Sequence, residues 1–481
     1  MNYFNYNFNT ILLTLTNKFM LKLKLIAICT FLFLGISAFA QTDSTDEGKL
    51  TLSGYIDSYY LTSLKGNPSG NLMGNAGATI PNPGYNPADP NSSATLPAVL
   101  GGAPVGRAFD RLTNQFALGL VQIKAMYSNK RSDMVIDLTF GPNAELGNFG
   151  NGIGSAKGVL PTNGYQLSLY GSGISIKQAY WTYKATSKLS FTVGQFGTHI
   201  GYEVIDAPVN YHYSLSNLFN NGPFYHVGAK ANYAFSDNVG LMVGVVNNWD
   251  AMTDYKKQKS IIAQLYLKPA KGFNVYLNYI GGFHDDGYKV NSNLPGATGA
   301  VASSYSGFGP DAKYSRHLWD LTTGYQITDK FYLGINAAWG FYSGDSTFKS
   351  NAKARSAALK KDSLTILPWG GVAVYANYQI TDMIGIGARF EHFQDKYEVR
   401  YLGATNNSLT ITAPITLANG HLIVKPEFRM DASPASFGTK TLSNGTEEKI
   451  YYYETKEKNV DGGYKSSMSQ MTIGCAFVYK Y

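Results

Sequence analysis

Six charged residues near the C-terminal end of the sequence are spaced two apart, in two groups. They are Arg389, Glu391, Lys425, Glu427, Arg429 and Asp431. Side chains two residues apart project from the same face of a β-strand, so each group would place its charges on one surface. Rings of fixed charge select ions in pores, whereas opposite charges on a wet wall can simply brace it. Because the set mixes both signs, solute selection and bracing both stay open.

Five more polar residues lie on alternating segments and would share the inward face of such strands. They are Asp57, Gln122, Lys124, Asp137 and Asp320. We expect them to line a polar interior together with the six charges, and none of these positions implies catalysis.

A long connection, Gly197–Pro223, carries the second group of candidate residues. It contains Tyr202, Glu203, Tyr211 and His212. The connection is apolar for an exposed segment, so we expect it to pack against a barrel wall, neighbouring loops or a subunit interface. If it folds inward and narrows a channel, Glu203 is the fixed charge nearest the narrowest point.

Signals for other chemistry are weak. The 7 histidines include no H-x-x-x-H pair and the 2 cysteines form no cluster, so we expect no metal site and no cofactor. The segment His284–Gly287 could hold a cation, but beside a strand end it is more simply a solvated loop start. No serine is marked as a nucleophile, so we expect no enzyme. The net charge of +8 is scattered rather than clustered, which argues against nucleic-acid binding.

The elements that must position these residues are short alternating strands. Met134, Ile136 and Leu138 form one apolar face, and Asp137 lies on the other. The same period of two recurs over residues 331–340. Side chains of a strand point alternately to its two faces, so such segments have one apolar and one polar surface.

Short turns and long connections alternate along the chain. We predict short turns at Ser128–Asp133, Thr186–Lys188, Ser236–Asn238, Pro269–Gly272, Thr328–Lys330, Thr381–Met383 and Ala418–Gly420. We predict long connections at Ser63–Asp110, Pro142–Gly173, Gly197–Pro223, Asp250–Lys259, His284–Ser315, Ser343–Thr365, Lys396–Asn407 and Ser433–Lys465. This asymmetry is typical of bacterial outer-membrane barrels and is rare in soluble β-sandwiches. The sequence therefore predicts an all-β fold, a transmembrane antiparallel β-barrel of about 16 strands.

The N-terminus reads as a secretion signal. Lys22 precedes the apolar run Leu25–Ile36, and a small-residue cleavage site ends at Ala40. The run is shorter than the roughly 20 apolar residues of a membrane-spanning helix. We therefore expect residues 1–40 to be a signal peptide and 41–481 to be a single barrel domain. Translation could also begin at Met20, in which case the first 19 residues are an over-called start.

Several segments resemble the OmpL-like family of outer-membrane β-barrel porins. Leu52–Tyr60 resembles the family's opening strand, and the stretch Ile176–Gly228 is the most specific part of the similarity. Arg389–Phe393 and Lys425–Asp431 resemble the family's paired Arg/Glu strands, whereas the loop Ser63–Asp110 is individual. The resemblance implies a transmembrane barrel with porin function.

The predicted function is a water-filled channel in the outer membrane for passive diffusion of small hydrophilic solutes or ions. An outer-membrane structural or adhesin-type barrel without an open channel is the alternative. A gated transporter would need a plug domain, and only about ten residues separate Gln41 from Leu50. We expect both termini in the periplasm, with outer-membrane lipid around the barrel. The final strand, Ser466–Tyr481, resembles the signal read by barrel-assembly machinery. The sequence leaves open whether the barrel is a monomer or a homo-oligomer.

Overall fold

The fold was analysed in a computed structural model of the chain. It describes residues 48–65, 79–81, 95–97, 107, 109–110, 112–147, 174–252, 258–285, 313–346, 348–350, 366–397, 400, 405–433, 438–450, 453–458, 460 and 464–481. The barrel unit consists of Leu50–Ser128 and Ser132–Tyr481. In the other unit, the structure describes Gly48, Lys49 and the turn Asn129–Arg131, in which the Asn129 side chain accepts a hydrogen bond from the backbone of Arg131.

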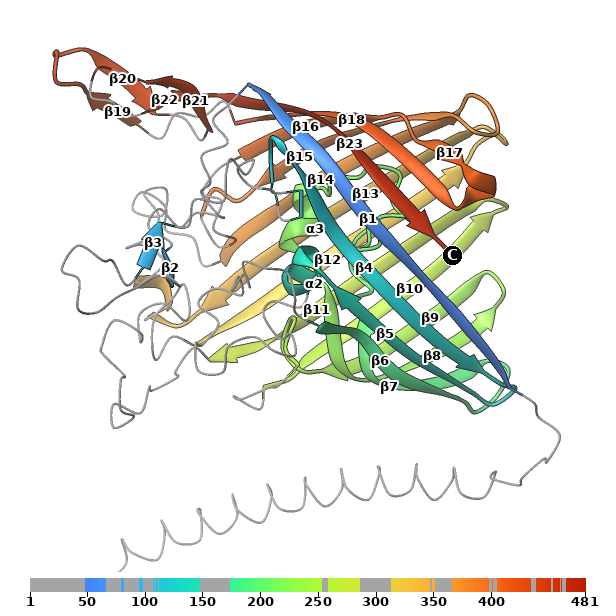
Figure 1. Cartoon of the computed structure of the whole chain (residues 1–481). Helices are drawn as coiled ribbons and strands as arrows, with labels where there is room; N and C mark the ends of the chain where they lie inside the picture. The colour runs from blue at the N-terminus through green and yellow to red at the C-terminus, as the bar shows by residue number, and fades with distance from the viewer. Residues whose placement is uncertain are drawn as a thin grey trace, which may run out of the picture. The chain divides into compact units, whose positions relative to one another are not determined.

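One antiparallel sheet closes on itself to form the barrel (Figure 1). Its strands are β1 (Lys49–Lys65), β4 (Gln115–Ser128), β5 (Ser132–Phe140), β6 (Ile174–Lys184), β7 (Leu189–Gly197), β8 (Tyr225–Ser236), β9 (Val239–Val246), β10 (Ser260–Ala270), β11 (Phe273–Asp285), β12 (Lys313–Gln326), β13 (Phe331–Gly344), β14 (Ile366–Gln379), β15 (Gly385–Gln394), β16 (Thr405–Thr412), β17 (Ile415–Leu417), β18 (Leu422–Ala432) and β23 (Ser469–Lys480). Strand β1 closes the barrel by pairing with β23 on one side and with β4 on the other.

The sheet has 17 strands by hydrogen bonding, but β16 and β17 both pair with β18 and share one position, so 16 strands surround the barrel. The break between β16 and β17 falls at Ala413 and Pro414. Proline has no backbone N–H, so it cannot donate to a neighbouring strand at this point. The prediction of an antiparallel barrel of about 16 strands is confirmed.

The described structure also contains six small strands and, besides helical residues at 346 and 348–350, three short helical segments. They are β2 (Thr79–Pro81), β3 (Thr95–Pro97), β19 (Gly438–Thr441), β20 (Glu447–Ile450), β21 (Tyr453–Lys458), β22 (Tyr464–Ser467), α2 (Pro142–Gly147), α3 (Asn217–Asn221) and the 3-10 turn η1 (Ala418–Gly420). The small strands pair in twos outside the barrel sheet, as β2–β3, β19–β20 and β21–β22. In the described part of the chain, no helix is both long and apolar enough to cross a membrane.

Each of the seven predicted short turns lies between two strands that pair directly. Three of them use the same device, a threonine at the first position. The hydroxyl oxygens of Thr186, Thr328 and Thr381 accept hydrogen bonds from backbone N–H groups two and three residues later. Such a bond reverses the chain locally without help from distant residues, which is why these turns can be read from sequence.

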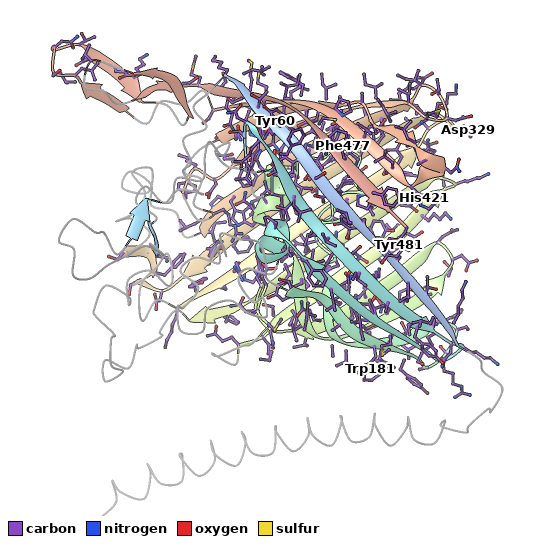
Figure 2. The ribbon with its side chains drawn as sticks, viewed as in Figure 1. Tyr60, Trp181, Asp329, His421, Phe477 and Tyr481 are labelled. Atoms are coloured by element: carbon purple, nitrogen blue, oxygen red, sulfur yellow. The ribbon has the colours of Figure 1, made fainter. Side chains whose placement is uncertain are left out.

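The outer face of the barrel wall is apolar, as a lipid-facing surface must be. Exposed side chains on this face include Ile123, Met134, Ile136, Trp181, Leu277, Trp319, Trp339, Val372, Phe390 and Ile473. Figure 2 shows Trp181 projecting away from the wall, and Asp329 at the end that carries the short turns. Aromatic pairs lie near this end, among them Tyr233 with Phe235 and Phe273 with Tyr325. Aromatic belts of this kind mark the interface between membrane and water.

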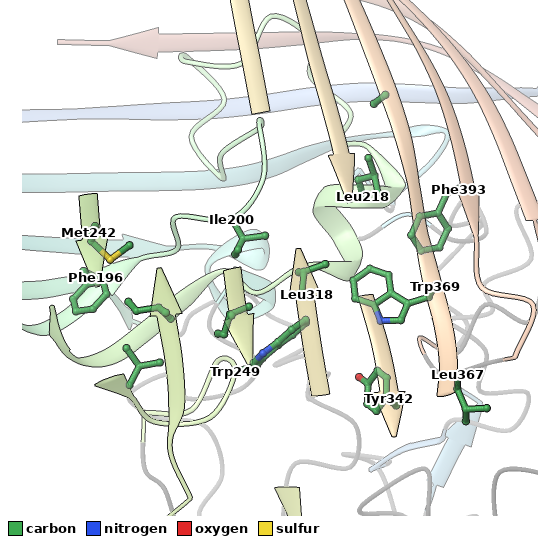
Figure 3. Close-up of a cluster of buried hydrophobic side chains, with 14 of the residues drawn as sticks. Phe196, Ile200, Leu218, Met242, Trp249, Leu318, Tyr342, Leu367, Trp369 and Phe393 are labelled. Atoms are coloured by element: carbon green, nitrogen blue, oxygen red, sulfur yellow. The ribbon is translucent and has the colours of Figure 1, made fainter. Parts of the chain in front are cut away.

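The interior holds a large apolar cluster in addition to polar groups (Figure 3). Ile200 and Leu218 come from the connection between β7 and β8, and they pack with Leu318, Trp369 and Phe393 of the wall. The cluster occupies part of the barrel interior, and buried apolar side chains exclude water there.

Candidate functional site in the barrel interior

The third long connection, Gly197–Pro223, lies against the inward faces of the strands, and we call it the inner loop. Two consecutive N–H groups of this loop, those of Tyr213 and Ser214, donate to the carboxylate of Glu427 on β18 at 2.7 and 3.1 Å. Buried backbone N–H groups need acceptors, and here a wall carboxylate supplies both. The short helix α3 within the loop is buried over its whole length.

Glu391 on β15 holds the helical part of the inner loop. Its carboxylate accepts the N–H groups of Asn217 and Leu218 at 2.8 and 2.7 Å, and also the side-chain amide of Asn217 at 2.7 Å. The first N–H groups of a helix have no partner within the helix. The hydroxyl of Ser216 caps a further one by accepting from Phe219. Glu391 therefore satisfies donors that would otherwise be buried without acceptors.

Three cations on the same strands bind carbonyl oxygens of the inner loop. Arg389 donates to the oxygen of Ser214 at 2.7 Å, and Arg429 donates to that of Leu215 at 2.7 Å. Lys425 donates to two further loop carbonyls, the first at 2.7 Å. All three side chains are buried, with exposed fractions of 0 to 1%.

The sixth charge, Asp431, binds the first long connection instead. Arg107 of that connection lies 3.0 Å from one carboxylate oxygen of Asp431, and Arg429 lies 2.8 Å from the other. Ser408 and Gln470 donate to the same carboxylate at 2.7 and 3.0 Å. Sequence reasoning did not single out Arg107, because an arginine in a long irregular loop has no spacing that identifies its partner.

The mixture of signs on β15 and β18 matches the polarity of the loop backbone. Carboxylates face N–H groups, and cations face carbonyl groups. A buried charge without a partner is destabilised by several kcal/mol, so this matching is what allows the charges to lie inside. These contacts hold the inner loop against β15 and β18.

Two inward carboxylates outside the paired strands also contact the inner loop. Asp57 on β1 accepts the hydroxyl of Tyr213 at 3.2 Å. Asp320 on β12 accepts the N–H of Gly201 at 2.9 Å. In the order of strands around the barrel, the loop is thus attached to β1 and β18 on one side and to β12 on the other.

Asp137 on β5 belongs to a polar group at the loop's other edge. Gln122 donates to it at 3.1 Å, and the ammonium of Lys177 lies 3.8 Å away. Lys177 also forms an ion pair with Asp206 of the inner loop. Lys124 pairs in register with Asp137 across β4 and β5. Lys177 and Asp206 were not among the predicted residues, since neither belongs to a recognisable pattern.

Two of the four predicted loop residues pack into the wall. The ring of Tyr202 stacks on Tyr375 of β14, with centroids 4.2 Å apart. Glu203 is buried and lies 2.5 Å from Arg389, and it also accepts the N–H of Ser216 at 2.7 Å. Glu203 and Arg389 therefore neutralise each other in an ion pair.

His212 and Tyr211 lie next to each other on the loop. The Nδ1 atom of His212 lies 2.7 Å from the hydroxyl of Thr412 on β16. Burial, together with nearby arginine and lysine charges, holds the pKa of His212 well below its usual range, so its ring is neutral at pH 7. The ring of Tyr211 lies over Gly385 and Gly387, where any side chain would overlap it.

A recess of about 470 Å³ lies between the inner loop and the wall. It is lined by Tyr202, Glu203, Pro208, Val209, Asn210, Tyr211, His212, Tyr332, Tyr375, Asn377, Gln379, Pro414, Thr416, Ile423 and Lys425. Tyr332, Gln379 and Thr416 stand near strand ends that carry short turns. Within the described residues, no group of three or more His, Cys, Asp or Glu side chains is arranged to hold a metal ion.

Comparison with known families gives one match over almost the whole chain. A family model described as "Putative beta-barrel porin-2, OmpL-like" matches residues 49–480. Among curated proteins, none matches the chain.

The solved structures to which the chain is similar include the following three. OmpT of Vibrio cholerae is 11% identical, covers 92% of this chain and 100% of its own, and superposes with a TM-score of 0.46. The outer membrane channel DcaP of Acinetobacter baumannii is 11% identical, with 92% and 99% covered and a TM-score of 0.47. An anion-selective porin from Comamonas acidovorans is 8% identical, with 90% and 100% covered and a TM-score of 0.48.

Proposed function

This chain belongs to the OmpL-like family of β-barrel porins, proteins of the outer membrane, and from that premise we propose how solutes cross it. Small hydrophilic molecules or ions diffuse passively along a narrow route beside the inner loop. No cofactor takes part. The wall charges set the width of this route by holding the loop in place. We call the protein a restricted porin, because the inner loop narrows its channel.

The observation that carries this proposal is the attachment of the inner loop by five wall charges. Glu391, Glu427, Arg389, Lys425 and Arg429 all bind backbone groups of the loop. Hydrogen bonds to charged groups are each worth about 1.5–3 kcal/mol. A loop attached at five points keeps a fixed position, so the restriction is a constant feature of the barrel.

The test is conductance of the purified protein in a planar bilayer, compared with a variant that lacks Ala207–Asn217. We expect small single-channel currents from the natural chain and larger ones from the deletion variant. A matched control lacks the β19–β20 hairpin, Gly438–Ile450, which belongs to a separate sheet. Its conductance should equal that of the natural chain. Equal conductance of all three folded proteins would contradict the proposal.

The alternative, a structural barrel without an open channel, is favoured by the apolar cluster around Trp369 and Leu218. The same measurement separates the two functions. A natural chain that is silent, beside a deletion variant that conducts, would identify a barrel closed by its own loop. Silence of both folded proteins would remove the porin function altogether.

Export and assembly are the remaining parts of the proposal. We expect removal of residues 1–40 during secretion, which mass spectrometry of protein from outer membranes can establish. The last strand, β23, is followed directly by an aromatic residue, Tyr481, and this end would be recognised by barrel-assembly machinery. Replacing Tyr481 by Ser should lower the amount of assembled barrel in the outer membrane, whereas replacing Tyr233 should not.

A further inference from the structure

The recess beside the inner loop has the size of a small-molecule site. Its volume of about 470 Å³ falls within the range of ligand pockets, roughly 300–1,000 Å³. The loop supplies one side of the recess, and β13, β14, β18 and the segment Pro414–Thr416 at β17 supply the other. A solute that enters from the short-turn end would reach this recess before it meets the apolar cluster.

The recess is lined by one acidic and one basic side chain, Glu203 and Lys425, and both already have partners within the barrel. Glu203 binds Arg389 and the N–H of Ser216. Lys425 donates to carbonyl oxygens of the inner loop. A charged ligand would have to displace these contacts or remain unpaired, so the lining favours a neutral molecule.

Four polar atoms on the lining residues are buried without a hydrogen-bond partner among the described residues. They are the hydroxyls of Tyr211 and Tyr375, the side-chain oxygen of Asn377 and the Nε2 atom of His212. Buried polar atoms are usually paired, so four orphans on the lining of one recess call for partners from a molecule outside the protein.

The hydrogen bonds around His212 determine whether its unpartnered Nε2 atom is a donor or an acceptor. Thr412 donates its hydroxyl proton to Glu427 at 2.8 Å, so its oxygen accepts from His212. The Nδ1 atom of His212 therefore carries the proton, and Nε2 of the neutral ring is an acceptor. The amide oxygen of Asn377 is an acceptor too, and a hydroxyl-bearing ligand would supply both donors.

Tyrosine rings complete the recess. Tyr202 and Tyr375 stack on each other at its edge, and Tyr211 and Tyr332 also line it. A Cβ atom at Gly387 would overlap both Tyr211 and the Asn377 oxygen, so the glycine leaves room for these two groups to stand together. Aromatic surfaces beside fixed acceptors suit molecules that have both apolar C–H faces and hydroxyl groups.

We infer that this recess binds a neutral polyhydroxylated solute of mono- or disaccharide size, whose hydroxyl groups donate to His212 and Asn377 and form a hydrogen bond with the hydroxyl of Tyr211. The inference rests on the proposed function, since it names the class of solute that the restricted porin would admit. It adds a binding site to what would otherwise be a simple restriction.

Isothermal titration calorimetry tests the site on the folded full barrel in a detergent without a sugar headgroup. The probes are maltose and glucose, with gluconate and glucosamine as charged counterparts of glucose. We expect maltose and glucose to bind, and both charged probes to bind at least about tenfold more weakly, because an unpaired charge near a buried site is disfavoured. Gluconate or glucosamine binding as tightly as glucose would overturn the assignment to neutral solutes.

Tyr211→Phe is the most informative variant, because the hydroxyl of Tyr211 has no partner among the described residues. Its removal takes no described hydrogen bond from the protein, so the barrel should fold normally. We expect maltose affinity to fall roughly fivefold, which corresponds to one hydrogen bond. Tyr378→Phe is the matched control, because Tyr378 follows Asn377 on β14 and is exposed on the outer face. It should bind maltose as the natural chain does.

Failure of the site and failure of the porin function give different results. Channels that conduct without binding maltose would overturn the site and leave the restricted porin intact. Maltose binding that Tyr211→Phe leaves unchanged would also overturn the site as assigned. If the barrel does not conduct but binds maltose, and Tyr211→Phe weakens that binding, the binding site is supported and the channel function is not.

Discussion

The guanidinium of Arg389 on the barrel wall lies 2.5 Å from the carboxylate of Glu203 on the inner loop, in a buried ion pair. Arg389 also donates to the carbonyl oxygen of Ser214. One wall residue thus binds two separate parts of the loop. Replacing either member of such a pair leaves a buried charge without its partner, whereas replacing both does not.

This pairing predicts that the single variants Arg389→Met and Glu203→Gln are destabilised by about 3–5 kcal/mol. The double variant should recover much of that loss, because neither charge is then left alone. Urea unfolding of the barrel in lipid vesicles measures these differences. Additive losses in the double variant would show that the two side chains do not depend on each other.

Neutralising Glu391 should loosen the inner loop. The carboxylate of Glu391 accepts two backbone N–H groups and an amide, and the single oxygen of glutamine cannot replace all three contacts. We expect Glu391→Gln to raise single-channel conductance and current noise in a planar bilayer. Asp329→Asn, in an exposed short turn, serves as the control and should leave both quantities unchanged.

Removing two wall cations should change ion preference. The variant Arg389→Ser with Arg429→Ser lowers the positive charge of the interior by two, and the remaining carboxylates attract cations. The reversal potential in a salt gradient should move toward cation selectivity. Lys330→Ser, in a short turn, is the control: it removes one positive charge, as each of the two arginine substitutions does, but outside the barrel interior. An unmoved reversal potential in the folded double variant would limit both arginines to bracing.

The low pKa of His212 predicts a stability that depends on pH. In the folded state its ring stays neutral, because burial and the charges of Arg389, Lys425 and Arg429 oppose protonation. In the unfolded chain it takes up a proton near pH 6.5, so its contribution to stability is lost as pH falls below that value. Relative to His212→Gln, the natural barrel should lose about 2 kcal/mol between pH 7.5 and 5.0.

Urea unfolding of both proteins at the two pH values gives this double difference, in which other titrating groups cancel. A constant difference between the natural chain and His212→Gln would show that His212 becomes protonated inside the folded barrel.

A side chain at position 387 should disturb the neighbouring residues. A Cβ atom there would overlap the ring of Tyr211 and the oxygen of Asn377. Overpacking of this kind typically destabilises by about 1–3 kcal/mol. We expect Gly387→Ala to lower maltose affinity as Tyr211 is displaced, whereas Ala388→Gly on the outward face should not. Unchanged affinity would indicate that Tyr211 has room to move aside.

The barrel itself could be predicted from sequence because its signals are local. The period of two around Asp137 defines the faces of a strand, and a threonine such as Thr328 closes a turn through its own neighbours. The inward side of Arg389, Glu391 and the charges of β18 followed from the same period. These features depend on residues a few positions apart, and short-range geometry is determined by the backbone alone.

What the inward charges bind was decided only by the tertiary structure. Arg389 meets Glu203 across 186 positions of sequence, and Glu427 meets Tyr213 across 214. Most of the partners are backbone N–H and carbonyl groups, which every non-proline residue carries and which therefore leave no mark in the residue types. The sequence alone determined that the inner loop must pack against something. The loop lies inside the barrel because closure of the sheet brings distant strands around it. The charges on these strands then pair with the backbone N–H and carbonyl groups of the loop, and the recess remains beside them.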